Sequence, residues 1–403
     1  MRKTLLAAFA VLATAAEAAP PSADAVIAHY ADMAEASYSQ SAAAAGEMKA
    51  AIDAFLSQPT EANLASARAA WKAARVPYLQ SEGFRFANTV VDDWEPKVNA
   101  WPLDEGLIDY VGPAYGKTSD QNPLYTLNVV ANARLRVGAK TVDASKIDAA
   151  LLRRLQEAEG VQTNVSTGYH AIEFLLWGQN PNGAKGGTGA RPATDYDVKA
   201  CTHANCARRA DYLRAASDLL VADLNEMAAD WGKDGKARDE LMAKGGDGGL
   251  SEILTGLGSL TFGEMAGERM KLGLMLHDPE EQQDCFSNNT HNSHYYDEVG
   301  IAGIWRGRGG AGLRDYVAGA DPAAAKRLDD AIDAAAAAIA KIHDAGENGQ
   351  MAYSQMIAAG NAPGNAMIRD AVDALVAQTR AIEGVASVLH LKVASDKSDH
   401  APK

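Results

Sequence analysis

A histidine and a glutamate three positions apart, His170 and Glu173, lie in a strongly apolar stretch of the chain. On an α-helix such positions share one face, so the imidazole and the carboxylate can reach a single ion. Apolar residues at positions 172 and 174–177 point in nearly every direction around the helix, which predicts a buried turn. A buried carboxylate needs a cation, a hydrogen-bond network or a bound ion. The pair therefore predicts a metal site, and a structural His–Glu hydrogen bond is the alternative.

The spacing alone is weak evidence, because four of the nine histidines precede an acidic residue by three positions. The other three such histidines are His29, His277 and His294. None of them lies in a comparably apolar run, and Pro279 would interrupt a helix after His277. The apolar context, more than the spacing, singles out His170 and Glu173.

A second helical stretch has an unusual stripe of aromatic and charged side chains. Its members are Trp71, Arg75, Tyr78, Glu82 and Arg85. If this helix packs beside His170, Glu82 supplies a third ligand, and Trp71, Tyr78 and Arg85 line the site. One nitrogen and two carboxylates suit zinc or iron and leave positions open for water or substrate. The alternative is an exposed ion pair between Glu82 and Arg85, worth about 0.3–0.5 kcal/mol.

Two polar segments without clear helical spacing are further candidates. Residues 92–110 are acidic and aromatic and contain Asp104, and residues 288–297 contain His291 and His294. Long loops rich in Trp and Tyr often carry function, although packing over the end of a bundle is their commoner use. We expect Asp104 and His291 to lie near the site. His291 and His294 are also candidates for a second cation site.

Complete catalytic motifs are missing from the sequence. It has no His-Glu-x-x-His, and the inverted form fails because Phe174 follows Glu173. No nucleophile elbow, Walker loop or dinucleotide fingerprint stands out. Whether the protein is an enzyme is therefore left open by its residues.

The net charge and the N-terminal residues limit the possible partners and the location of the protein. The chain has 403 residues, of which 52 are acidic and 38 are Lys or Arg, for a net charge of -14. Nucleic acid is not expected as a partner, whereas cations would be attracted. Arg2 and Lys3, an apolar run at 5–12 and small residues around Ala18 predict a signal peptide over residues 1–19. We expect a periplasmic protein that is not a lipoprotein, since no cysteine follows the cleavage site, and that has no transmembrane segment.

The three cysteines fit an oxidising compartment. Cys201 and Cys206 could close a small disulfide loop, leaving Cys285 unpaired. Cys285 could instead pair with either of them, and a zinc site of Cys201, Cys206 and His203 is a less suitable alternative because its thiolates would have to stay reduced.

Helical spacing over most of the chain predicts an all-α fold of two helical-bundle domains packed side by side with long connecting loops. We place these domains at residues 20–195 and 196–394, followed by a disordered tail at 395–403. Thr60 is a predicted helix cap, as is Asp321 with Pro322 behind it. Glycines 256, 263, 267 and 273 weaken one helix, which indicates close backbone packing between the bundles.

The stretch Gly168-Tyr169-His170-Ala171-Ile172-Glu173 resembles the Gly-x-His-x-x-Glu signature of the imelysin family. Further stretches are similar to the iron-regulated protein A branch of that family: 71–85, 101–106, 201–209, 268–270 and 285–291. The resemblance implies a two-bundle helical envelope protein linked to iron supply, with a metallopeptidase label. It also implies that His170 and Glu173 hold the metal, iron or zinc.

Three functions are compatible with these expectations. The first is a periplasmic protein that binds iron or an iron-bearing small ligand for uptake, alongside an envelope transport component. The second is a zinc-dependent metallopeptidase. The third is an envelope protein-interaction module in which the His–Glu pair is structural.

Overall fold

The computed structural model describes residues 19–393. The signal peptide predicted over residues 1–19 and the tail predicted over 395–403 lie outside this range, except for Ala19. Within it the protein is built almost wholly of helices, as the sequence predicts, with one short β-hairpin.

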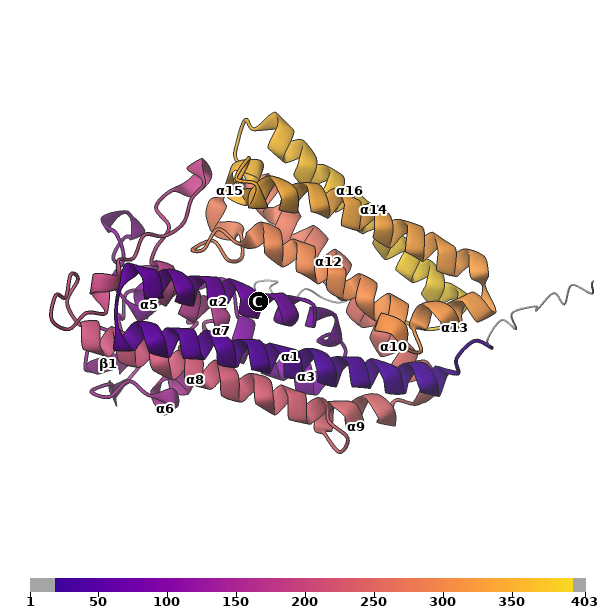
Figure 1. The fold of residues 1–403 in the computed structure, drawn as a ribbon, viewed down its shortest axis with the longest axis horizontal. Helices are drawn as coiled ribbons and strands as arrows, with labels where there is room; N and C mark the ends of the chain where they lie inside the picture. Colours follow the sequence, from indigo (N-terminus) through magenta and orange to yellow (C-terminus); the bar gives the residue numbers. More distant parts are fainter. Residues whose placement is uncertain (1–18, 394–403) are drawn as a thin grey trace, which may run out of the picture.

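The helices form two layers that lie side by side (Figure 1). The first layer and its connections contain α1 (Ala23–Ser57), α2 (Glu61–Leu79), η1 (Glu82–Phe84), α3 (Thr89–Trp94), α4 (Pro96–Asn99), α5 (Glu105–Ile108), η2 (Pro113–Tyr115), α6 (Ala149–Leu155), η3 (Ala158–Gly160), α7 (Gly168–Trp177), η4 (Gly183–Lys185), η5 (Ala193–Asp195), α8 (Cys206–Trp231) and α9 (Lys236–Ala243). The second contains α10 (Gly245–Gly258), η6 (Ser259–Leu272), α11 (Gly273–Leu276), η7 (Pro279–Glu281), α12 (Thr290–Arg306), η8 (Gly307–Gly309), α13 (Leu313–Ala320), α14 (Pro322–Glu347), α15 (Tyr353–Ile357) and α16 (Ala362–Val388).

Helix α1 is the centre of the first layer, since it packs along both α2 and α8. In the second layer α14 packs along α16, and α12 lies against α14 and also against α2 of the first layer (Figure 1). The short helix α7, which carries the His-x-x-Glu pair, packs between α2 and α8. It is therefore enclosed by the first layer.

The two layers are not divided at the predicted domain boundary. Helix α8 begins beyond residue 195, yet it packs along α1 in the first layer. One continuous cluster of buried apolar residues extends from Val26 to Ala386 through both layers. This continuous core does not mark a boundary between two domains, so the division into two independent domains stays a prediction.

Two predicted helix caps are confirmed. The Thr60 side chain accepts a hydrogen bond from the backbone N–H of Asn63 at the start of α2. Asp321 accepts from the N–H groups of Ala323 and Ala324, and Pro322 occupies the first turn of α14. Each cap satisfies backbone donors that a helix start leaves unpaired.

The hairpin consists of β1 (Arg134–Val137) and β2 (Lys140–Asp143), paired antiparallel with Leu135 opposite Val142. The sequence analysis did not predict it, because two strands of four residues give too short an alternation to stand out among helical patterns.

The glycine-rich helix continues from α10 into η6, a π-helix of 14 residues. At Gly256 a Cβ atom would lie 2.3 Å from the carbonyl oxygen of Gly83, whereas at Gly263 it would meet nothing within 4 Å. Close backbone packing between the layers thus explains Gly256 but not Gly263. Stretches of π-helix are rare and are often found at functional sites.

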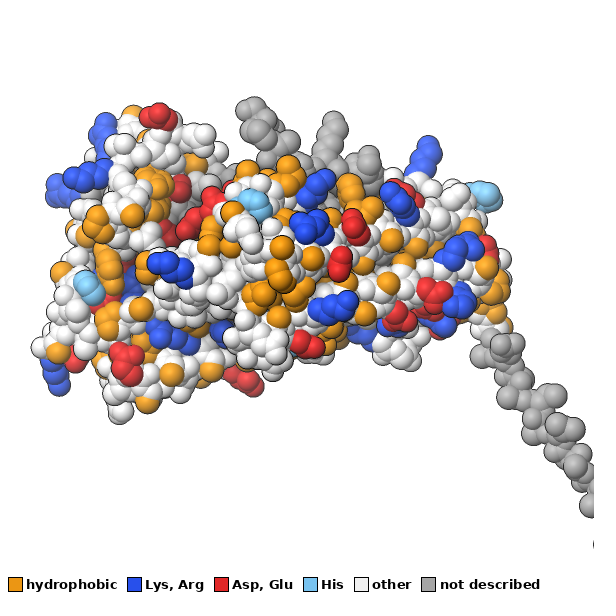
Figure 2. All heavy atoms as spheres, turned by 90° about the horizontal axis from the view of Figure 1, so that it is seen from above, with side chains coloured by type: hydrophobic (Ala, Val, Ile, Leu, Met, Phe, Trp, Pro, Cys, Tyr) orange, Lys and Arg blue, Asp and Glu red, His pale blue; other side chains and the backbone are white. Residues whose placement is uncertain are grey.

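The surface mixes charges of both signs. Figure 2 shows Lys, Arg, Asp and Glu side chains interspersed with apolar ones over the face viewed from above. In the part of the chain from 19 to 393, no helix combines the length and the apolar character needed to cross a membrane.

Candidate metal centre

Helix α7 is buried along its whole length, and both polar members of its motif are inaccessible to solvent. His170 and Glu173 each have 0% relative exposure. The imidazole Nδ1 lies 3.2 Å from the Glu173 Oε2, and the second carboxylate oxygen accepts a hydrogen bond of 2.8 Å from the backbone N–H of Ser287. The spacing of three therefore brings the two side chains together, as predicted.

Gly168 allows α7 to begin where it does. Its φ of 82° lies in the left-handed region, and a Cβ atom there would be 2.4 Å from the carbonyl oxygen of Val98 in α4. Only glycine fits both requirements. The first residue of the motif thus positions the helix, and the third and sixth carry the chemistry.

Asp284 is the third member of the cluster. It precedes α12 in a left-handed backbone conformation, with a φ of 54°, and its Oδ1 lies 3.4 Å from the His170 Nδ1. One ligand atom from each of His170, Glu173 and Asp284 lies within 4.8 Å of the other two, and all three residues are buried. One imidazole nitrogen and two carboxylates therefore converge, the donor set expected of the site.

Glu82, the third ligand predicted from the sequence, is not a member of this group. Its Oε2 lies 2.6 Å from the Nη2 of Arg269, and its Oε1 accepts a hydrogen bond from the Asn99 amide. The oxygen of that same amide accepts a bond of 2.6 Å from Arg75. Glu82 is thus connected to the cluster only through other side chains. Asp284, and not Glu82, supplies the second carboxylate beside His170.

Arg75 supplies a positive charge beside the cluster. Its Nη2 is 3.2 Å from the Asp284 Oδ1, and both side chains are fully buried. The guanidinium packs near the rings of Trp71, Tyr78 and Tyr169, at 5.9, 5.6 and 5.1 Å from their centroids. The aromatic members of the predicted stripe therefore position Arg75, which contacts Asp284.

Burial sets the protonation of the three groups. It lowers the pKa of His170 to about 3, so the ring is neutral at physiological pH. Burial and then the charge of Asp284 raise the pKa of Glu173 well above its usual range. Burial also acts to raise the pKa of Asp284, but Arg75 and His170 hold it below its ordinary value. Without a cation, these shifts favour the protonated form of Glu173 and the ionised form of Asp284 beside Arg75.

One atom of the cluster has unused capacity. The His170 Nε2 is buried without a hydrogen-bond partner among the described residues, whereas the Asp284 Oδ1 has its ion-pair contacts with Arg75 and His170. Buried polar atoms are rarely left unsatisfied in proteins. The unpartnered Nε2 fits a site completed by something that the chain does not supply.

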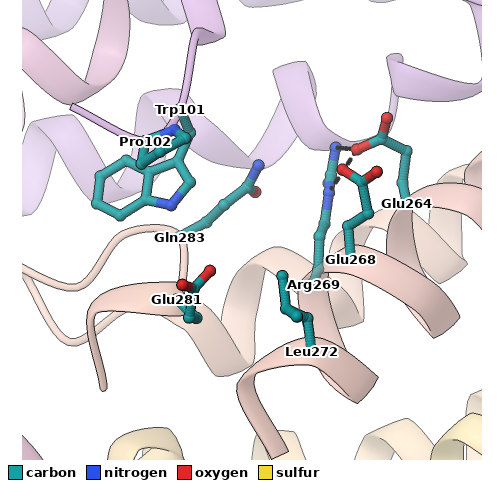
Figure 3. Close-up of a pocket in the computed structure, with 8 residues that line it drawn as sticks. All are labelled: Trp101, Pro102, Glu264, Glu268, Arg269, Leu272, Glu281 and Gln283. Carbon is teal, nitrogen blue, oxygen red and sulfur yellow. Dashed lines mark hydrogen bonds and ion pairs between the residues drawn. The ribbon is translucent and has the colours of Figure 1, made fainter. Parts of the chain in front are cut away.

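Two cavities lie beside Trp101, whose ring is also next to His170. The Trp101 ring lies 4.9 Å from the His170 ring, centroid to centroid, and lines two cavities of about 230 and 460 Å³ that share Glu264, Arg269 and Gln283. Figure 3 shows Trp101 and Pro102 on one side of the smaller cavity, with Glu264, Glu268 and Arg269 of η6 facing them. The ring therefore separates the buried cluster from an open, largely acidic space.

The other candidates are distributed around the fold. Arg85 faces the larger cavity and pairs with Asp92, Glu95 and Glu264. Asp104 accepts hydrogen bonds from Asn122 and Thr163, and His291 pairs with Glu347, so neither belongs to the buried group.

Cys201 and Cys206 form a disulfide at the start of α8, and Cys285 is a free buried cysteine. With both thiols in the disulfide, the alternative zinc site with His203 has no cysteine ligands. The His203 ring instead stacks on Tyr110 and pairs with Asp195.

Asp284, Arg75 and Trp101 are the important residues that the sequence did not assign to the site. Asp284 directly precedes the segment 285–291 that resembles iron-regulated protein A, but nothing in its spacing indicates a ligand. Arg75 was on the predicted stripe without a role, and Trp101 lay in the aromatic loop.

These features define a class of protein: a two-layer helical fold with a buried His-x-x-Glu helix beside an interlayer cleft. The chain belongs to the imelysin family, whose family model matches residues 34–382. This confirms the family predicted from the motif.

Individual relatives agree with this assignment. The chain is 36% identical over 72 residues to the iron-regulated protein A of Synechococcus elongatus, a match that covers 18% of this chain and 20% of that protein. The chain thus spans about a fifth of the length of this curated relative.

Two crystal structures have a similar fold. An iron-regulated protein A precursor from Parabacteroides distasonis superposes with a TM-score of 0.60 at 17% identity, covering 92% of this chain and 96% of its own. An imelysin-like protein from Psychrobacter arcticum gives a TM-score of 0.63 at 16% identity, covering 94% and 99%. These similarities confirm the all-helical fold.

Proposed function

We propose that this protein binds Fe²⁺ at His170, Glu173 and Asp284 and acts in iron uptake. The observation that carries the proposal is the convergence of one imidazole nitrogen and two carboxylate groups within 4.8 Å in a buried site. Imidazole and carboxylate ligands together suit iron and zinc. The family's iron-regulated members favour iron between the two.

The charges of the metal-free cluster are compatible with cation binding. The lowered pKa of Asp284 favours its ionised form beside Arg75, and the raised pKa of Glu173 favours its neutral, protonated form. Loss of that proton would add a second negative charge, and the cation would take the proton's place between the His170 and Glu173 side chains. Cation binding and proton release are thereby coupled.

The cleft favours a hydrated cation over an anionic iron chelate. Glu264, Glu268 and Glu281 line the smaller cavity against one arginine, Arg269. A space lined by carboxylates attracts a divalent cation and disfavours a citrate complex. The Trp101 ring between this cavity and His170 would have to move for the cation to enter.

The peptidase alternative is less well supported. A catalytic metal needs a position open to water and substrate, whereas all three ligand side chains have 0% relative exposure. The interaction-module alternative leaves unexplained why the His170 Nε2 is buried without a hydrogen-bond partner among the described residues.

We place the protein in the periplasm, where a signal peptide over residues 1–19 would deliver it. The disulfide between Cys201 and Cys206 supports an oxidising compartment. Cell fractionation with an antibody against the mature chain tests this location.

The decisive experiment measures iron bound to untagged protein under anaerobic conditions, by Fe²⁺ titration and elemental analysis. The test variant is Glu173→Gln, because the raised pKa of Glu173 favours its neutral form without metal and glutamine keeps the shape of the group. The control is Glu298→Gln, another fully buried carboxyl, which bonds to Gln378 in the second layer.

We expect one Fe²⁺ per chain in the wild type and in Glu298→Gln, and an affinity lower by about tenfold or more in Glu173→Gln. Equal iron affinity in all three proteins would remove the assignment. Titration with ferric citrate tests the chelate alternative. Cleavage of an unfolded polypeptide, measured with and without a chelator, tests the peptidase alternative.

A further inference from the structure

A second group of metal-binding side chains lies between α12 and α14, away from the cluster described above. The His291 Nε2 is 2.9 Å from the Glu347 Oε1, and the rings of His291 and His343 are 6.2 Å apart, centroid to centroid. His343 and Glu347 are four residues apart on α14, so they share one face of that helix. Two imidazoles and a carboxylate are thus brought together by two helices.

His294 does not take part, although its spacing from His291 had made it the expected partner. Its side chain is fully buried, its ring lies 5.0 Å from that of Tyr353, and neither of its nitrogens has a hydrogen-bond partner among the described residues. On α12 it faces the interior, and His291 faces α14.

The His291 ring is held in position, and the partly exposed His343 ring lies beside it. A Cβ atom at Gly346 would lie 2.4 Å from the His291 ring, so the ring packs directly on the backbone of α14. The His343 ring stacks on Tyr295 at 4.1 Å with an interplanar angle of 27°. The Glu347 side chain is 50% exposed, which leaves the group accessible from solvent.

The two rings lie close to the distance that a shared metal ion needs. With a Zn–N bond of about 2.1 Å, a zinc ion lies about 3.2 Å from each ring centroid, so two rings on one tetrahedral ion have centroids roughly 5.2 Å apart. The rings are 6.2 Å apart, so they must approach by about 1 Å to share the ion. The His291 Nδ1 is buried and unpartnered among the described residues, so the ring proton can move there from Nε2 when Nε2 binds a cation.

The protonation of the group also suits a cation. Burial lowers the pKa of His291, although Glu347 opposes this, and the hydrogen bond from His291 lowers the pKa of Glu347. A neutral imidazole and an ionised carboxylate are the forms that bind metal.

We propose that His291, His343 and Glu347 form a second metal site, which takes a nitrogen-preferring divalent cation such as Zn²⁺ at the surface of α12 and α14. In residues 19–393 only the His170 group has three ligand atoms within 4.8 Å of one another, so this site closes by rotation of its side chains. Glu347 and His343 can rotate, since their side chains are 50% and 19% exposed. The site shares no residue with the His170 cluster.

The experiment is a Zn²⁺ titration of the untagged full chain by calorimetry, repeated with Co²⁺ to record the absorption of a nitrogen-ligated ion. The background is His170→Ala with Glu173→Gln, so that the first cluster does not contribute. The test changes are His343→Ala, at a half-buried side chain, and Glu347→Gln, at an exposed one. The control is His390→Ala, an exposed histidine just after α16.

We expect the background protein and His390→Ala to bind one Zn²⁺, His343→Ala to lose it, and Glu347→Gln to bind about tenfold more weakly. Absence of Zn²⁺ binding in the background protein, or binding that neither test change alters, would overturn the proposal. Because the first cluster is removed, this result is independent of iron capture. Circular dichroism identifies any variant that fails to fold.

Discussion

Arg75 and Asp284 are 209 residues apart in the sequence, yet they form a fully buried ion pair with 3.2 Å between Nη2 and Oδ1. Arg75 belongs to α2 in the first layer, and Asp284 lies in the segment that leads into α12 in the second. The pair joins the two layers, and it balances the charge of the cluster without a bound cation.

Replacing Arg75 by methionine should lower the free energy of unfolding by about 3–5 kcal/mol, because Asp284 is left as an uncompensated buried charge. Fe²⁺ should recover part of this loss by binding the unpaired Asp284 carboxylate. Urea denaturation with and without Fe²⁺ measures both effects.

The matched control is Arg306→Met, which removes a largely exposed ion pair with Asp333 and should cost about 1 kcal/mol or less. Equal losses in the two variants would contradict the role of Arg75.

Iron affinity should rise with pH at the His170 cluster. Below the raised pKa of Glu173, binding must displace its proton, so affinity should increase about tenfold per pH unit. Calorimetry in buffers of different ionisation enthalpy should count about one proton released per cation. The Glu173→Gln variant should lose this pH dependence; if it keeps the dependence, another group releases the proton.

Stability of the metal-free protein should also depend on Glu298. Burial raises the pKa of this carboxyl to about 8 from its usual value of 4.5. Its folded-state pKa is raised, so its stabilising contribution is complete below pH 4.5 and is lost as the pH rises through 8. Urea unfolding from pH 6 to 9 should therefore show a smaller decline in Glu298→Gln, with an Asp373→Asn surface variant as control. Parallel curves for wild type and Glu298→Gln would exclude this group as a cause.

Gly168→Ala should lower the free energy of unfolding by about 2 kcal/mol or more, since it combines a left-handed backbone with a collision at Val98. Gly263→Ala is the control, because its Cβ meets nothing within 4 Å and alanine is the better helix former. It should be neutral or stabilising by up to about 1 kcal/mol. Thermal unfolding compares the two, and similar effects would show that α7 does not need glycine at its start.

Trp101→Ala should speed both uptake and release of iron several-fold, because the ring covers His170 and lines the cleft. Trp101→Phe keeps an aromatic cover and should resemble the wild type. Stopped-flow mixing with Fe²⁺ and then with a chelator measures the two rates. Identical rates in Trp101→Ala and the wild type would exclude this route of entry.

Local features of the fold were predictable from the sequence. The helical spacing, the caps at Thr60 and Asp321 and the burial of 170–177 depend on neighbours within a few positions, and the structure confirms them. The family was predictable for a similar reason, since its motif requires a glycine, a histidine and a glutamate at fixed places on one helical turn.

The tertiary structure alone decided which carboxylate faces His170. Glu82 and Asp284 are both acidic and both distant in sequence, and neither spacing nor composition distinguishes them. Glu82 is neutralised by Arg269, and Asp284 reaches the imidazole from a left-handed loop residue. Likewise α8 packs along α1 although the predicted boundary separates them. A helix is fixed by contacts between near neighbours, whereas a site made from several helices depends on packing across the whole chain, which no short segment specifies.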